Sequence, residues 1–149
     1  MNKQIIINGS HNRNGDTTKL IQEIYPEIAS LKLIDYTIEI YNYDETYSDK
    51  DQFLKIINQL IEVDKIIFAT PVYWYSMSSL MKIFFDRLTD LISSQETIGR
   101  KLMGKKVSVI TSSIGNHLDD NFFLPFIETA NYLHLEYIGG KHYLKQNNV

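Results

Sequence analysis

The chain has 149 residues, no cysteine and a net charge of −3, the balance of 15 Lys plus Arg against 18 Asp plus Glu. This length is typical of a single domain, which buries enough surface to fold without disulfides or metals. The missing cysteine excludes disulfides, thiolate nucleophiles and cysteine-bound zinc or iron–sulfur centres, and the small negative charge argues against a nucleic-acid-binding protein.

The predicted elements alternate between strands and helices along the chain. The strands are short β-branched or apolar runs, and the helices carry apolar residues at helical spacing. In chain order they are the strand Gln4–Asn8, the helix Thr17–Ala29, the strand Leu33–Tyr41, the helix Asp51–Glu62, the strand Lys65–Ala69, the helix Ser78–Ile92, the strand Lys106–Thr111, the helix Asp119–Leu133 and the strand Leu135–Ile138. Pro26 falls in the last turn of the first helix, so we expect that helix to end or bend early.

This alternation predicts a three-layer α/β sandwich that forms one domain over residues 1–149. Strands and helices in strict alternation with short connections are typical of a parallel sheet with helices on both faces. Right-handed crossovers leave few strand orders, and five strands favour the flavodoxin-like order 2-1-3-4-5. Only nine residues follow Gly140, so we expect the last helix of this fold to be short or absent.

The sequence predicts neither a targeting segment nor a membrane helix. Residues 1–7 carry one lysine and a short apolar run, whereas a signal peptide needs roughly 7–15 apolar residues. No run approaches the roughly 20 apolar residues of a membrane helix. We therefore expect a cytoplasmic protein with no membrane and no nucleic-acid partner.

The first candidate ligand loop is polar and opens directly into a helix. Ligands of such sheets bind beyond the carboxyl ends of the strands where the strand order reverses, which selects the loops 9–17, 70–78 and 112–119. The first loop reads GSHNRNGDT, and its hydroxyls and helix N-terminus are typical of a phosphate site. Its glycine spacing matches neither a Walker A loop nor a dinucleotide-binding turn. The alternative is a polar turn in which Asp16 or Thr17 caps the helix.

The second candidate loop carries an apolar and aromatic tip. Val72, Tyr73, Trp74 and Tyr75 follow a buried strand directly. Exposing such residues costs hydrophobic free energy unless a flat group covers them. A planar ring ligand would do so, and the alternatives are a dimer contact or a loop folded back onto the core.

Together the two loops resemble the NADPH-dependent FMN reductase group of flavodoxin-like proteins. The shared residues of the first loop are Gly9, Ser10, Asn14, Gly15 and Thr17. Those of the second motif are Pro71, Val72, Tyr73, Trp74, Met77, Leu80, Lys82, Phe84, Asp86 and Arg87. The resemblance extends from the first strand to the fourth, and its second motif is the more specific.

The resemblance implies an FMN-dependent oxidoreductase, with NADH or NADPH as hydride donor and a free flavin, a quinone or an azo compound as acceptor. The flavin carries the chemistry, so no side chain is a catalytic acid or base and no metal is required. Residues Ser10, Asn12, Asn14, Asp16 and Thr17 would hold the FMN phosphate. Residues Pro71, Val72, Tyr73 and Trp74 would follow one edge of the flavin ring, and residues Ser112, Ser113, Ile114 and Gly115 its other side.

Two departures from the family pattern concern the phosphate loop. The family commonly has Asn at the position of Asp16, and an aspartate there would repel the phosphate unless it caps its own helix. The family often has Pro-Arg where this chain has His11 and Asn12, so Arg13 is the candidate replacement, one place along.

Other interpretations follow from charge and histidine placement. The four histidines are not at metal-ligand spacing, although His11 and His117 lie in ligand-side loops and could contact FMN or substrate. An electron carrier of the flavodoxin type is the main alternative, but carriers of this class are usually strongly acidic. A flavodoxin-like domain that has lost its cofactor is a third alternative.

Two features of the sequence predict properties of the protein surface. Apolar residues of the third predicted helix, Ser78–Ile92, span an arc of roughly 140°, slightly more than one sheet-facing stripe needs. This arc favours a homodimer, with a generous core helix as the alternative. The tyrosines Tyr36, Tyr41, Tyr43 and Tyr47 are predicted to face solvent from an edge strand and the loop after it.

Overall fold

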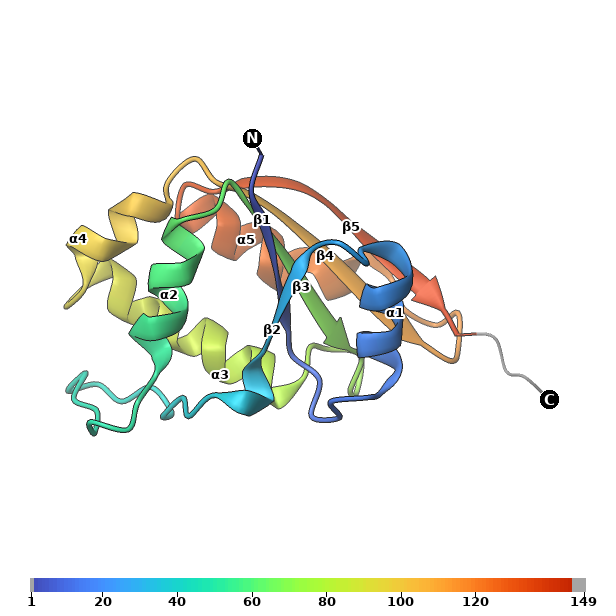
Figure 1. Cartoon of the computed structure of the whole chain (residues 1–149), viewed down its shortest axis with the longest axis horizontal. Helices are drawn as coiled ribbons and strands as arrows, with labels where there is room; N and C mark the ends of the chain where they lie inside the picture. The colour runs from blue at the N-terminus through green and yellow to red at the C-terminus, as the bar shows by residue number, and fades with distance from the viewer. Residues whose placement is uncertain (1, 146–149) are drawn as a thin grey trace.

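Five parallel strands form the central sheet in the order β2-β1-β3-β4-β5, which confirms the predicted order (Figure 1). The structure, a computed structural model, describes residues 2–145. The strands are β1 Gln4–Asn8, β2 Ala29–Lys32, β3 Lys65–Pro71, β4 Lys106–Ser113 and β5 Glu136–Leu144.

Helices cover both faces of this sheet, in unequal numbers (Figure 1). The helices are α1 Asp16–Ile24, α2 Phe53–Ile61, α3 Ser79–Arg87, α4 Glu96–Gly99 and α5 Leu124–Tyr132. Ile6, Ile67 and Ile110 pack with Ile21 of α1 on one face, whereas their neighbours along the strands pack with α2, α3 and α5 on the other. This division follows from the alternation of side chains along a strand, and it confirms the three-layer α/β architecture.

The predicted second strand was wrong. The strand β2 is Ala29–Lys32, whereas Leu33–Tyr41 contains the 3₁₀ turn η1 Leu33–Asp35 and then no strand. Helix α1 ends at Ile24, just before Pro26, so the chain enters the sheet earlier than the predicted helix Thr17–Ala29 allows. Tyr36 and Ile38 pack on the core from an irregular segment after η1, whereas Ile40 is exposed; their alternation resembles that of a strand.

Several helix boundaries also differ from the predictions. The third predicted helix divides into α3, with Ser78 as its N-cap, and a 3₁₀ segment η2 Leu88–Ile92. The fourth divides into η4 Asp120–Phe123 and α5. Helix α4 was not predicted, and β5 continues well beyond Ile138. Within the described residues 2–145 no helix follows β5.

The apolar arc of the third predicted helix is used inside this domain. Met81, Phe84, Leu88 and Leu91 are buried, whereas Ile92 is exposed. The core-helix interpretation therefore accounts for most of the arc, and the homodimer stays a prediction.

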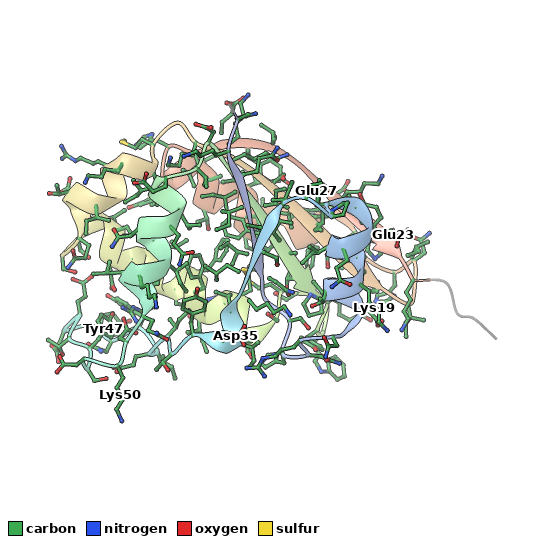
Figure 2. All side chains as sticks on the ribbon, in the orientation of Figure 1. Lys19, Glu23, Glu27, Asp35, Tyr47 and Lys50 are labelled. Carbon is green, nitrogen blue, oxygen red and sulfur yellow. The ribbon has the colours of Figure 1, made fainter. Side chains whose placement is uncertain are left out.

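Arg87 ties α3 to the segment between η1 and α2, and its side chain is only 1% exposed. Its guanidinium donates to both carboxylate oxygens of Asp51 at 2.7 and 3.0 Å and to Asp90 at 2.9 Å. The Tyr47 ring lies 3.4 Å from its central carbon, and Figure 2 shows this tyrosine on the connecting segment. The motif arginine therefore has a structural role here.

The edge-strand interpretation of the tyrosines was wrong, because none of the four lies in a strand and only one of them is exposed. Tyr43 is exposed, but Tyr36 packs against the core and Tyr47 is partly buried beside Arg87. Burial and the hydrogen bond that its hydroxyl donates to Asp90 raise the pKa of Tyr47 to about 12. The segment uses tyrosine as a packing group for a buried cation.

Candidate functional site

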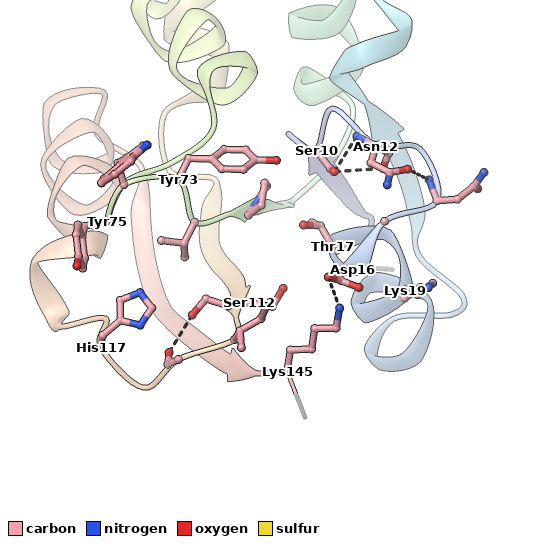
Figure 3. A pocket seen from close by; sticks show the side chains of 18 residues that line it. Ser10, Asn12, Asp16, Thr17, Lys19, Tyr73, Tyr75, Ser112, His117 and Lys145 are labelled. Atoms are coloured by element: carbon pink, nitrogen blue, oxygen red, sulfur yellow. Dashed lines mark hydrogen bonds and ion pairs between the residues drawn. The ribbon is translucent and has the colours of Figure 1, made fainter. Parts of the chain in front are cut away.

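Three loops and the end of β5 meet at the carboxyl edge of the sheet around a pocket of about 640 Å³. Figure 3 shows the polar residues of the first loop and α1 at one end and Tyr75 and His117 at the other. All the residues predicted from the resemblance line it, and their binding role stays a prediction. The lining residues are Ser10, Asn12, Asn14, Gly15, Asp16, Thr17, Lys19, Pro71, Val72, Tyr73, Trp74, Tyr75, Ser112, Ser113, Ile114, Gly115, His117 and Lys145.

The polar end is built from a loop whose side chains hold its own backbone. The Ser10 amide donates to Asn8 Oδ1 at 2.9 Å, and the Asn12 amide donates to Ser10 Oγ at 3.1 Å. The Asn14 amide donates to Asn12 Oδ1 at 3.1 Å. Short Asn and Ser side chains favour such local bonds. Neighbouring elements hold the loop as well, since the Gly9 amide donates to the Ala69 carbonyl at 2.8 Å and the Ser78 hydroxyl donates to the Gly9 carbonyl at 2.6 Å.

Helix α1 begins at this loop without a side-chain cap. Gly15 is the N-cap, so the alternative in which Asp16 or Thr17 caps the helix is wrong. A Cβ on Gly15 would lie 3.0 Å from Cβ of Asn12, so any side chain there would require Asn12 to shift. The uncapped first-turn N–H groups and the buried Thr17 form a donor set that suits an anion.

The charges at this end form ion pairs that the sequence did not predict. Asp16 accepts from Lys145 Nζ at 2.8 Å, so a lysine and not a capping role offsets its charge. Arg13 donates to Asp35 at 2.7 Å and does not line the pocket. The prediction that Arg13 replaces the family arginine was therefore wrong, because the arginine is held against η1.

The aromatic end is a tight turn with an unusual backbone. The amides of Tyr73 and Ser76 each donate to the other's carbonyl at 2.9 and 3.1 Å. Trp74 and Tyr75 between them have φ values of 50° and 66°, the geometry of a type I′ turn that normally favours Asn and Gly. Each such residue costs about 1–2 kcal/mol. The loop projects, leaving Trp74 93% exposed, instead of folding back onto the core.

Two histidines connect the third loop to its neighbours. His117 lines the pocket and meets the Tyr75 ring edge-on, with centroids 5.4 Å apart. His142 of β5 lies 2.7 Å from Ser113 Oγ, and burial together with the charge of His117 lowers its pKa. His11 contacts Ser79 at 3.1 Å and does not line the pocket. The sequence analysis considered His11 and His117 as ligand contacts, and the structure brings only His117 to the pocket.

The residues present fit a phosphorylated planar ligand such as FMN. The pocket volume of about 640 Å³ falls in the range of roughly 300–1,000 Å³ that is usual for small-molecule sites. Uncapped helix N–H groups and hydroxyls suit a phosphate, and the exposed aromatic turn suits the edge of a ring.

Sequence reasoning missed Lys19, Tyr75 and Lys145 as site residues. Tyr75 belongs to the aromatic tip and Lys19 to the first turn of α1, so both stood beside predicted residues. Lys145 follows β5 at the same sheet edge as the other loops. The rule that ligands bind at the carboxyl ends of strands would have found it, had the strand been predicted to its full length.

The described part of the chain has neither a cluster of metal-ligand side chains nor a helix that could span a membrane. Residues 2–145 contain no group of three or more His, Cys, Asp or Glu side chains arranged to hold a metal ion. In the same range, every helix falls short of the length and apolar character required to cross a membrane.

Comparison with known proteins links the chain to flavin enzymes. The model of the family described as NADPH-dependent FMN reductase matches residues 2–121. FMN-dependent NADH:quinone oxidoreductase 2 from Colwellia psychrerythraea is 28% identical over 68% of the chain, and the uncharacterized NAD(P)H oxidoreductase YdeQ from Bacillus subtilis is 29% identical over 65%. The chain spans about half the length of these relatives, 56% and 54%. General stress protein 14 from Treponema denticola, solved in complex with FMN, superposes with a TM-score of 0.69 at 17% identity, covering 97% of this chain and 87% of that one.

Proposed function

Because the chain belongs to the NADPH-dependent FMN reductase family, we propose that it holds FMN in the pocket at the carboxyl edge of the sheet. It passes a hydride or electrons from NADH or NADPH through that FMN to a small-molecule acceptor, such as a free flavin or a quinone. The observation that carries the proposal is the convergence of three loops on one pocket with a polar and an aromatic end.

The polar end would hold the phosphate of FMN. Ser10 and Thr17 would donate from their hydroxyls, Asn12 and Asn14 from their side-chain amides, and the first turn of α1, which Asp16 begins, from its backbone N–H groups. Neutral donors and a helix end bind an anion while keeping cations away from the reacting ring.

The aromatic end and the third loop would hold the flavin ring. Pro71, Val72, Tyr73 and Trp74 would follow one edge of the ring, and the segment 112–115 its other side. The turn at Trp74 is held by its own backbone bonds, so it is preorganised and costs little ordering on binding.

FMN, when bound, supplies the hydride and electron transfer. The residues of this chain position the ring and exclude water, and no side chain acts as a catalytic acid or base. The exposed surface beside Trp74 leaves room for a nicotinamide or an acceptor to approach the pocket.

The proposal includes a homodimer in the cytoplasm, where NADH and NADPH are available. Ile92, at the end of the apolar arc of the third predicted helix, is exposed, and a second copy would cover it. Its exposure supports a dimer, which sedimentation or light scattering would test directly.

Spectroscopy of the purified protein tests the function. We expect the chain to bind FMN with a shifted visible spectrum, and NADH or NADPH to bleach that spectrum anaerobically. Steady NAD(P)H consumption with a quinone or free flavin supports the enzyme. Stable FMN binding with no turnover supports an electron carrier, and failure to retain or rebind FMN refutes the proposal.

A further inference from the structure

The ion pair between Lys145 and Asp16 closes the polar end of the pocket (Figure 3). The two residues are 129 positions apart, yet Lys145 Nζ lies 2.8 Å from Asp16 Oδ2. The Lys145 backbone amide donates to the Ser113 carbonyl at 2.9 Å, which continues the pairing of β5 with β4. The register of the sheet therefore places this lysine beside the start of α1.

The Asp16 carboxylate would repel a phosphate in this pocket, and the Lys145 ammonium can offset that repulsion. Asp16 is the first residue of α1 and lines the pocket where the proposed phosphate would bind. An aspartate there favours the helix but repels a second anion. The lysine cancels one negative charge, and without it the carboxylate would face the phosphate directly.

The ion pair of Lys145 and Asp16 can bind an additional hydrogen-bond acceptor through the lysine. A lysine ammonium has three N–H donors, and Asp16 takes one of them. The Lys145 and Asp16 side chains are 45% and 50% exposed, so the pair contributes little free energy by itself and is easily shared. Arg13, the other cation of this region that was considered from the sequence, is engaged by Asp35.

We propose that Lys145 binds the phosphate of the flavin while it neutralises Asp16, so that the pocket selects FMN over riboflavin. The inference rests on the proposed function, because flavin binding supplies its ligand. It adds a binding residue from the end of β5 to the loops expected from the family resemblance.

Binding of two flavins that differ only in the phosphate tests this role. Dissociation constants for FMN and riboflavin are measured by fluorescence quenching at low ionic strength for the full chain and for Lys145→Gln. We expect FMN affinity to fall by roughly ten- to a hundredfold, the range for one hydrogen bond to a charged group, with riboflavin affinity unchanged. The fall should shrink in high salt, because screening weakens the contact.

Matched variants separate this contact from a general charge effect. Lys141→Gln makes the same charge change on β5 outside the pocket, and should leave both affinities within about twofold. Lys19→Gln makes the same charge change inside the pocket, and should lower FMN affinity less than Lys145→Gln does. Asp16→Asn should strengthen FMN binding, and should restore part of the loss in the Lys145→Gln background.

The outcomes distinguish this inference from the proposed function. If the unaltered chain binds FMN but Lys145→Gln binds it equally well, the inference fails and the proposed function stands. Parallel loss of FMN and riboflavin, or a larger effect of Lys19→Gln, also overturns it. If the unaltered chain binds neither flavin, both fail.

Discussion

Replacing Arg87 by methionine tests the charge balance of the buried cluster that anchors α3. The arginine is 1% exposed, and its partners Asp51 and Asp90 are 9% and 3% exposed. Methionine keeps the length of the apolar stem but leaves two carboxylates facing each other without a cation. Breaking a buried pair in this way costs about 3–5 kcal/mol, a large share of the roughly 5–15 kcal/mol that stabilises a typical domain.

Urea unfolding at several pH values measures this cost and its cause. Burial raises the pKa of Asp51, but the Arg87 hydrogen bonds and charge outweigh it and hold that pKa below its ordinary value. The cluster therefore stabilises the native chain above the ordinary aspartate pKa of about 3.9, and this contribution is lost as the pH falls through the lowered value. In Arg87→Met the carboxylates repel each other, so acidification should recover stability.

Two further variants make the test specific. Lys82→Met removes a cation of the same helix whose pair with Asp86 is about half exposed, and should cost less than about 0.5 kcal/mol. Asp51→Asn in the Arg87→Met background should restore stability by removing one uncompensated charge. The reasoning is refuted if Arg87→Met costs no more than Lys82→Met, or if its stability falls on acidification as in the unaltered chain.

Three more predictions concern the pocket and the Tyr47 hydroxyl. Thr17→Ala removes a buried hydroxyl and should weaken FMN binding by about 1–3 kcal/mol in a fluorescence titration; an unchanged affinity would place the phosphate elsewhere. Tyr75→Gly should stabilise the chain by about 0.5–1 kcal/mol, since glycine avoids the left-handed penalty but costs entropy, and should weaken FMN binding; a loss of stability would show that the turn is unstrained. Tyr47→Phe should remove the ionisation near pH 12 from an ultraviolet titration. Because the pKa of Tyr47 is raised in the folded chain, its contribution to stability is present below about pH 10 and is lost toward pH 12.

The strand order could be predicted from sequence because the three central strands β1, β3 and β4 carry strong apolar runs between the helices. The edge strands are weaker: β5 has no fully buried residue, and in β2 only Leu31 is buried. An edge strand that buries one side chain leaves almost no periodic signal. Tyr36 and Ile38, which follow it, pack on the core from an irregular segment, so their alternation predicted a strand over the wrong residues.

The length of β5 was missed because its two adjacent glycines predict a break. Gly139 has a φ of +135° at the register shift between β4 and β5, where β5 has one extra residue between the partners of Val107 and Ser108, so the strand is irregular there and continues. A Cβ on Gly140 would lie 2.4 Å from Phe123 Cδ1, so this glycine permits close packing of the strand. Long-range contacts of this kind cannot be read from a single sequence, and they determine that Lys145 reaches the pocket.

The aromatic turn shows why the site could be located although its geometry could not be predicted. A type I′ turn is normally predicted from Asn-Gly or Gly-Gly, and Trp74 and Tyr75 oppose that preference. Local preference and global structure usually agree in natural sequences, and disagreements concentrate where function constrains the residues. Two large rings held in a strained turn and left 93% and 63% exposed stabilise the free chain little. Their presence is explained if a flat ligand covers them, which is the interpretation that the proposed flavin site requires.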